Sequence, residues 1–345
     1  MAYGLIQNTT LQSIADAIRQ KNESSDTYKP GEMAAAILGI TTGEPDWTEL
    51  GYEDTPSEIL TAFEYSKYIH DNWEELRELG VPKYTNNKKM FLFPNVDITE
   101  TGLYNAMFEG SNLIHIEPII IGQESGSGVP NCQTMFKGTL IGEIKISAKN
   151  DTQHFNTNNM FNGCANLEKA ELNLISDNLQ YMFGGCKSLT AVSGNFDTSS
   201  ATSANTCFED CNNLVTAPSI NLTGTTNCYR MFHNCLELVN VPSYTLTNCT
   251  NLQQMFWNCS KLANIGTITI PSATNLTNMF QSTGNSLTET SRDNILQMCV
   301  SATAYTGTKT LANLGFANTM YTAASWQALE HYNDFITAGW TIGYS

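Results

Sequence analysis

The sequence predicts an α/β solenoid of about eight turns, with a parallel sheet on one side and short helices on the other. A Met-Phe pair recurs from Met107-Phe108 to Met279-Phe280, and Cys207-Phe208 fills the one gap. Successive pairs are 28, 25, 22, 25, 24, 24 and 24 residues apart. Apolar residues at helical spacing surround each pair, and an alternating, β-branched stretch follows it. Since neither element can bury its apolar face alone, successive units must stack on one another.

Two segments precede the array. Residues 1–45 resemble two short amphipathic helices, the second opened by Pro30, and we expect them to serve attachment and assembly. Residues 46–100 should form a linker and a capping helix, because Thr55-Pro-Ser-Glu58 is a capping box. We expect that helix to end near Leu79, before a glycine and a proline.

Residues 101–290 should form the array, and the stretch from Asn251 to Ile270 shows one unit. Its apolar residues fall at i, i+3, i+4, i+7 and i+10, which predicts one face of a short helix: Leu252, Met255, Phe256, Cys259 and Leu262. Asn251 can cap the first turn or form an asparagine ladder between units. This asparagine recurs four residues before most of the other Met-Phe pairs, as Asn131, Asn156, Asn178, Asn227 and Asn275. The alternating stretch from Ile265 to Ile270 predicts a strand with one buried face.

The array repeats this pattern often enough to predict its core. The repeat core comprises Met160, Phe161, Cys164, Met182, Phe183, Cys186, Phe208, Cys211, Met231, Phe232, Cys235, Met255, Phe256, Cys259, Met279 and Phe280. The five cysteines occupy one position of the repeat, so we expect them to be free thiols that pack as small apolar groups. Neighbouring units lie about 4.8 Å apart, which permits a disulfide by distance, but parallel side chains do not meet without movement of the backbone.

Residues 291–345 should close the array as a C-terminal cap, because a terminal repeat otherwise exposes its core. Helices are expected near Ile295–Ala302 and Ala323–Thr337, with Gly339 as the stop.

Composition excludes several classes of function. The net charge of −16 argues against binding to nucleic acid or to an anionic membrane, and no apolar run is long enough to span a bilayer. The first twenty residues lack the pattern of a secretory signal peptide. No nucleophile, phosphate-binding or metal-ligand motif occurs, so we expect no catalytic residues, no cofactor and no metal.

The motif N-[LC]-x-x-M-F-x-[GN]-C-x-x-L resembles the BspA-type leucine-rich repeat of bacterial surface proteins and phage virion proteins. The resemblance covers roughly 103–290 and implies binding of a protein or glycan by an extended surface, without catalysis. The leader TLQSIADAIRQKNESSDTYKPGEMAAAILGI is similar to one on tail and baseplate-associated proteins of phages of Gram-positive bacteria. The closing ITAGWTIGYS resembles the end of BspA-type phage proteins.

These resemblances imply a structural and adhesive virion protein, assembled in the host cytoplasm and released by lysis. Its N-terminal segment would bind other virion proteins, the solenoid would bind a host cell-surface glycan or protein, and the protein would be a homo-oligomer. A bacterial BspA-type surface adhesin is the alternative interpretation. A polysaccharide-degrading virion enzyme comes third, since it would need a pair of carboxylates from distant turns.

Two faces of the array are candidates for ligand binding. The strand face offers uncharged hydroxyl and amide groups: Ser219, Asn221, Ser243, Thr245, Thr267 and Thr269. Threonine is also simply a good strand residue. The other face carries a variable column two residues after each Met, where His233 and Trp257 fall on neighbouring turns. An exposed Trp beside a His would suit an aromatic sugar platform or a protein hot spot, although Trp257 could instead shield the helices or contact another subunit.

Overall fold

The structure, a computed structural model, describes residues 68–79, 85, 88, 92–94, 96–99, 104–123, 128–317 and 319–343. The expected amphipathic helices within residues 1–45 and the capping box at 55–58 lie outside the described residues.

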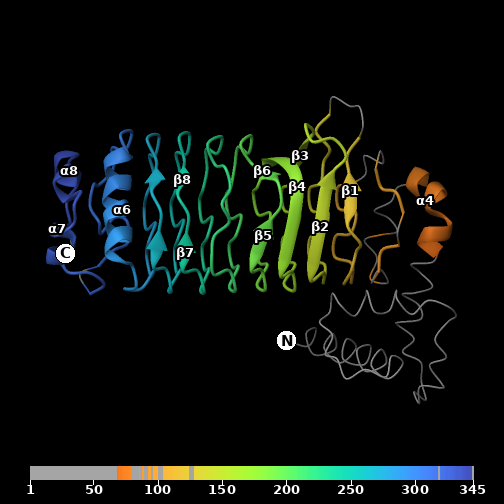
Figure 1. The fold of residues 1–345 in the computed structure, drawn as a ribbon, viewed down its shortest axis with the longest axis horizontal. Helices are drawn as coiled ribbons and strands as arrows, with labels where there is room; N and C mark the ends of the chain where they lie inside the picture. Colours follow the sequence, from red (N-terminus) through yellow and green to blue (C-terminus); the bar gives the residue numbers. More distant parts are fainter. Residues whose placement is uncertain are drawn as a thin grey trace, which may run out of the picture.

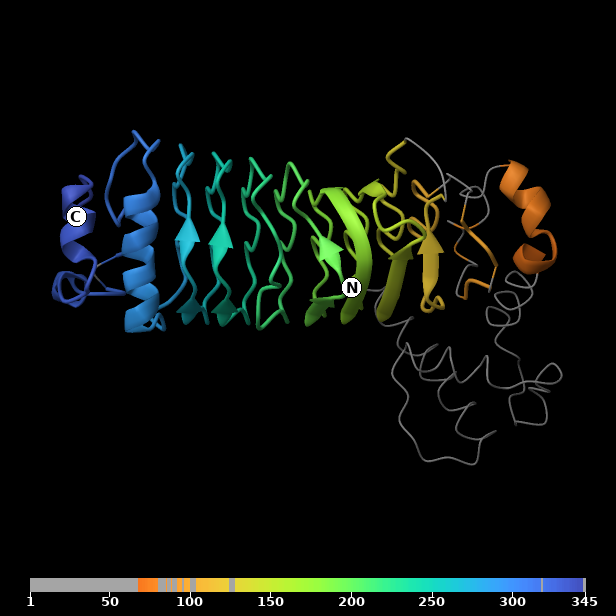
Figure 2. The same ribbon diagram turned by 45° about the horizontal axis from the view of Figure 1, so that its top comes forward.

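Successive turns of the chain lie side by side along one axis (Figure 1). The helix α4 (Trp73–Leu79) lies at one end, and α6 (Glu289–Ser301), α7 (Ala323–Gln327) and α8 (Tyr332–Thr337) lie at the other. Figure 2 shows the same row of turns from a second direction. Across the part of the chain that the structure describes, no helix is long and apolar enough to cross a bilayer.

All paired strands are parallel. One sheet contains β1 (Ile119–Ile121), β2 (Glu143–Ala148), β3 (His154–Asn156), β4 (Lys169–Asn178), β5 (Ala191–Ser193) and β6 (Phe196–Asp197). Two smaller sheets pair β7 (Asn240–Val241) with β9 (Asn264–Ile265) and β8 (Tyr244–Thr245) with β10 (Ile268–Thr269). The protein is therefore a parallel β-solenoid of about six turns with few helices, and the expected count of eight turns is not confirmed.

Alternation explains the longer strands. In β2 the residues Ile144 and Ile146 are buried and pair with Ala170 and Leu172 of β4. The intervening Lys145 points outward and forms an ion pair of 2.7 Å with a glutamate of β4. The predicted half-buried strand is thus present in these turns.

The later strands are short because the chain between them cannot pair fully. Pro242 separates β7 from β8 and has no N–H to donate. Opposite it, a Cβ on Gly266 would lie 2.5 Å from the backbone nitrogen of Ser243, so only glycine allows this approach of neighbouring turns.

The prediction of a short helix at each Met-Phe pair is wrong, because these segments are consecutive β-turns. Around Met255, N–H groups bond alternately within the turn and to the next turn. Met255 N donates to Leu252 O at 3.2 Å, whereas Phe256 N donates to Met279 O at 2.9 Å. Half of the bonds therefore join neighbouring units, as in a sheet, and no i→i−4 ladder forms.

Two positions per turn have positive φ, which a right-handed helix cannot contain. The position three after the Met has φ of 59–76° in Gly110, Gly138, Gly163, Gly185, Asp210, Asn234, Asn258 and Ser282. The position before the Met has φ of 52–58° in Ala106, Thr134, Asn159, Tyr181, Thr206, Arg230, Gln254 and Asn278. These residues reverse the chain twice, and the Met-Phe pair between them points inward.

The recurring asparagine opens each series of turns through its own side chain. Asn251 Oδ1 accepts a hydrogen bond from the backbone N–H of Gln253 at 3.1 Å, and Asn275 makes the same bond to Thr277 at 3.2 Å. The expected capping bond is present, but it begins a β-turn. The backbones of Asn227, Asn251 and Asn275 also form bridges between turns.

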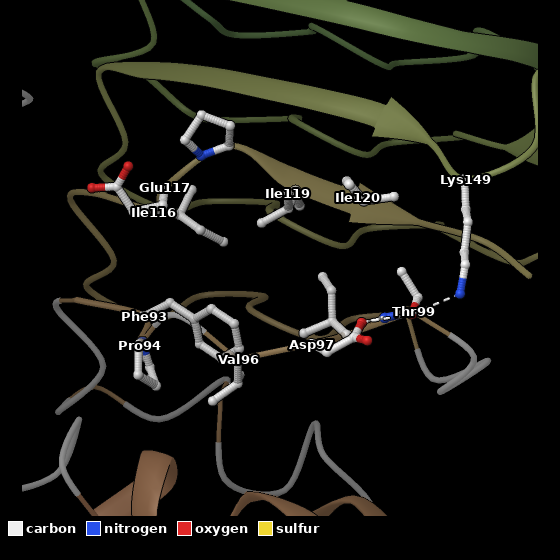
Figure 3. Close-up of a pocket in the computed structure, with 12 residues that line it drawn as sticks. Phe93, Pro94, Val96, Asp97, Thr99, Ile116, Glu117, Ile119, Ile120 and Lys149 are labelled. Carbon is white, nitrogen blue, oxygen red and sulfur yellow. Dashed lines mark hydrogen bonds between the residues drawn. The ribbon is translucent and has the colours of Figure 1, made fainter.

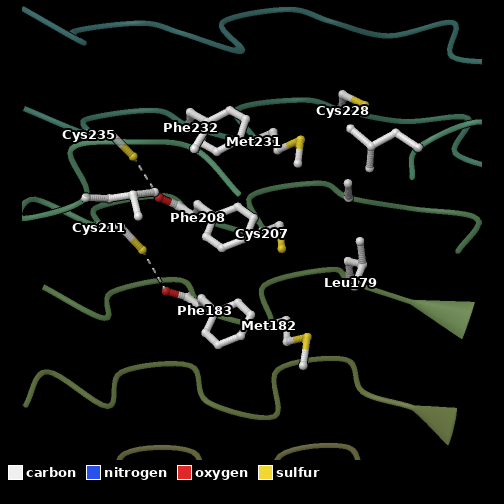
Figure 4. Close-up of a cluster of buried hydrophobic side chains, with 14 of the residues drawn as sticks. Leu179, Met182, Phe183, Cys207, Phe208, Cys211, Cys228, Met231, Phe232 and Cys235 are labelled. Carbon is white, nitrogen blue, oxygen red and sulfur yellow. Dashed lines mark hydrogen bonds between the residues drawn. The ribbon is translucent and has the colours of Figure 1, made fainter. Parts of the chain in front are cut away.

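The core is a stack of rings flanked by thiols (Figure 4). Eight fully buried phenylalanines stack in sequence with centroids 5.1–5.6 Å apart: Phe108, Phe136, Phe161, Phe183, Phe208, Phe232, Phe256 and Phe280. Each column cysteine donates its thiol to the phenylalanine carbonyl of the preceding turn, as Cys235 does to Phe208 O at 3.1 Å. All ten cysteines are buried and free. The thiols thus serve as hydrogen-bond donors as well as apolar filling.

Helix α6 covers the last sheet turn. Its Ser291 and Ser301 hydroxyls accept hydrogen bonds from the backbone N–H groups of Ile265 at 2.9 Å and Ile270 at 3.0 Å. These two donors would otherwise lack a strand partner at this end of the array. Gly339 has φ of 84° and follows Ala338, the C-cap residue of α8.

Candidate functional site

The strand-face candidates are exposed, but several of their polar groups are already bonded. All six positions are open to solvent: Ser219, Asn221, Ser243, Thr245, Thr267 and Thr269. Ser243 Oγ accepts from both the N–H and the hydroxyl of Thr267 at 3.0 Å. Asn221 Oδ1 accepts from the N–H and the hydroxyl of Thr223. This face presents a regular, uncharged surface whose hydroxyls partly satisfy one another.

The opposite candidates, His233 and Trp257, lie next to each other on neighbouring turns. Their ring centroids are 6.0 Å apart and the rings are tilted by 32°. Trp257 is half-buried rather than fully exposed, so only part of its indole faces solvent.

A glutamate and an arginine complete this surface. Glu209 Oε1 lies 3.4 Å from His233 Nδ1 and 3.7 Å from Arg230 Nη1. Arg230 Nε donates to Gln254 Oε1 at 2.7 Å, and the guanidinium lies 5.1 Å from the centroid of the Tyr229 ring. We call Glu209, Tyr229, Arg230, His233, Gln254 and Trp257 the turn-face cluster.

Sequence reasoning placed His233 and Trp257 in one column but missed the rest of the cluster. Arg230 and Gln254 precede the Met of their turns, and their positive φ brings them beside that column. A signal was available, because Arg230 is the only arginine between residues 78 and 291 and Trp257 the only tryptophan between 74 and 325.

Burial shifts the protonation of two groups in the cluster. Desolvation lowers the pKa of His233, and the charge of Arg230 lowers it further. Burial raises the pKa of Glu209, with the neighbouring Asp210 adding to the effect. At neutral pH the imidazole is therefore uncharged, and its Nδ1 is buried without a hydrogen-bond partner.

Beside the cluster, polar side chains form a ladder from turn to turn. Asn258 Nδ2 donates to Asn234 Oδ1 at 3.0 Å, and Asn234 Nδ2 donates to Asp210 Oδ1 at 2.9 Å. Since Asp210 is bonded in this way, Glu209 is the carboxylate of the cluster that a ligand would meet.

A separate pocket of about 370 Å³ lies between β1 and residues 93–94 and 96–99 (Figure 3). Its walls are mostly apolar, from Phe93 to Ile119 and Ile120. Its polar groups bond to one another, because Asp97 accepts from Thr99 and Lys149 donates to Thr99 at 3.4 Å. None of the ligand-binding residues expected from the sequence lines this pocket.

Three potential metal ligands also meet near the C-terminal helices, where sequence spacing indicated none. Asp293, Glu330 and His331 place ligand atoms within 4.8 Å of one another. However, the Asp293 carboxylate is occupied by the backbone N–H of His331 at 2.9 Å and by its Nδ1 at 2.7 Å. We assign this pair to the packing of α8 against α6.

Comparison with known proteins identifies the array. The profile of the family described as "Mycoplasma protein of unknown function, DUF285" matches residues 103–221 and 177–293, which together span more than half of the chain. No curated protein and no solved structure matches the chain. The repeats and the β-solenoid also fit the BspA-type resemblance of the sequence. The chain belongs to the DUF285 family.

Proposed function

We propose that this protein is a non-enzymatic binding protein that attaches a phage particle to its host through the turn-face cluster. The observation that carries the proposal is the concentration of Trp257, Arg230 and Tyr229 on two adjacent turns of an otherwise weakly charged array. Trp, Tyr and Arg dominate the energy of binding hot spots because they combine large apolar area with directed polar groups.

The cluster supports binding rather than hydrolysis. Glycoside hydrolysis needs two suitably spaced carboxylates. Here Glu209 stands beside Arg230, while Asp210 is bonded to Asn234. A reducing-end assay on host wall polysaccharide tests this part of the proposal, and release of sugar by the purified protein would contradict it.

The virion location rests on the similarity of the N-terminal leader and the closing residues to phage proteins. We propose that residues 1–45 bind other virion proteins and mediate homo-oligomerisation. We further propose eight turns, one for each ring of the phenylalanine stack, closed by α6–α8 as a cap.

A bacterial surface adhesin is the second candidate, favoured by the description of the family as a Mycoplasma protein. Mass spectrometry of purified particles and of the cell-surface fraction from the same culture separates the two. Recovery in the cell-surface fraction alone would contradict the virion proposal.

Adsorption of labelled full-length protein to a panel of Gram-positive bacteria and mycoplasmas tests the binding function. We expect at least one strain to bind the wild type, and Trp257→Ala to reduce that binding about tenfold or more, as expected for loss of a hot-spot residue. The matched control is Asn162→Ala, which alters the same column of the repeat outside the cluster. Equal adsorption by the folded Trp257→Ala variant would exclude the turn face and leave the strand face as the candidate.

A further inference from the structure

The turn-face cluster holds an acceptor and a donor side by side without a close bond between them. The 3.7 Å between Glu209 Oε1 and Arg230 Nη1 exceeds the length of a hydrogen bond, and both side chains remain partly exposed, at 20% and 35%. A carboxylate only accepts hydrogen bonds and a guanidinium only donates them. A hydroxyl does both, so it can bond to each group at once.

The guanidinium is also held in a fixed orientation. Its Nε is bonded to Gln254, and its plane lies near the ring of Tyr229. Arg230 is therefore restrained before any ligand arrives, which lowers the entropy that binding must offset.

An aromatic surface adjoins this polar pair. The imidazole of His233 lies between Glu209 on the preceding turn and Trp257 on the next. A ligand bonded at Glu209 and Arg230 could thus lay an apolar face over His233 and Trp257. A pyranose ring has this combination, with C–H groups on one face and hydroxyls around its edge.

Resting on the proposed binding function, we propose that the cluster recognises a neutral saccharide. The ring of one hexose unit packs on Trp257 and His233, and its adjacent hydroxyls bond to Glu209 and Arg230.

The charges exclude an acidic saccharide as the preferred ligand. Glu209 offsets the charge of the one guanidinium in the cluster, the neighbouring Asp210 adds a second negative charge, and the protein as a whole carries −16. A ligand carboxylate or phosphate would therefore meet net repulsion, and recognition of a neutral ligand gains specificity from this repulsion.

Periodate provides a direct test, because it cleaves the carbon–carbon bond between adjacent hydroxyls. Cells that bind the full-length wild type are treated with periodate, with protease, or with neither, and adsorption is then measured. We expect periodate to abolish the part of the adsorption that depends on Trp257, and protease to leave it unchanged. Adsorption that survives periodate but is lost after protease would overturn the saccharide proposal and retain the binding function.

A conservative variant tests the role of the polar pair. Glu209→Gln keeps the shape of the side chain but removes its charge, and we expect about a tenfold loss of adsorption, corresponding to loss of one charged hydrogen bond. Asn162→Ala again serves as the control. Stronger adsorption by Glu209→Gln would indicate an anionic ligand and overturn the proposal, whereas absence of adsorption by the wild type to every strain would overturn the binding function itself.

Discussion

Replacement of Phe232 tests whether the ring stack holds the solenoid together. Phe232 is fully buried and stacks on Phe208 at 5.3 Å and on Phe256 at 5.6 Å, with interplanar angles of 6° and 3°. Phe232 also stacks on Tyr244 at 6.4 Å. Phe232→Leu keeps most of the apolar volume but removes all three ring contacts; the two along the stack are worth about 0.5–1.5 kcal/mol each, so we expect a loss of at least about 1–3 kcal/mol. Phe232→Ala also leaves a cavity and should cost about 3–5 kcal/mol.

Equilibrium urea unfolding, followed by circular dichroism, measures these losses. The control is Phe196→Leu, which changes a half-buried phenylalanine of β6 outside the stack. We expect the control to cost less than Phe232→Leu. If Phe232→Leu is no less stable than Phe196→Leu, ring stacking does not contribute to the stability of the solenoid. Filling of the core volume alone would then explain why the Met-Phe pair recurs along this chain.

Three further predictions concern thiols, pH and backbone strain. Burial raises the pKa of Cys235 well above its usual value, so iodoacetamide at pH 8 should label the column cysteines only after unfolding, as mass spectrometry will show. The hydrogen bond with the Asp293 carboxylate raises the pKa of His331. The stabilisation that this pair gives the folded protein should therefore be complete below about pH 6.5 and lost as the pH rises through the folded pKa of His331. Asp293→Asn should remove this pH dependence of the melting temperature. Asn258 has φ of 59°, a conformation that strains alanine but not glycine. Both variants lose the bond to Asn234, so Asn258→Ala should lower the free energy of unfolding by about 1–2 kcal/mol more than Asn258→Gly.

The inward-facing residues could be predicted from the sequence, but the local backbone could not. Leu252, Met255 and Phe256 are fully buried, as their spacing indicated. Helical spacing and consecutive turns place apolar residues at the same intervals, so the pattern does not separate the two structures. The glycines and asparagines three residues after each Met do favour positive φ and were a usable signal. Arginine and glutamine do not favour positive φ, so the sequence gives no signal of it at Arg230 or Gln254. At these positions hydrogen bonds to the neighbouring turn impose the conformation.

The same cause explains which part of the site was predictable. His233 and Trp257 share a repeat position, so their proximity follows from the period alone. Arg230 joins them because the chain reverses just before Met231, and that reversal depends on tertiary bonds rather than on local preference. Its isolation as the single arginine of the array was compositional information that spacing arguments did not use.

The hydrogen bonds between turns have a consequence for the length of the molecule. Each unit donates its backbone N–H groups to carbonyl groups of the next unit and accepts the same bonds from its predecessor, as Phe256 N to Met279 O repeats Phe232 N to Met255 O. Duplication or loss of a whole 24-residue unit would preserve every type of contact. Each added unit would lengthen the array by about 4.8 Å. The length of the array can thus change in fixed steps through recombination between repeats, without any change in the segments at either end.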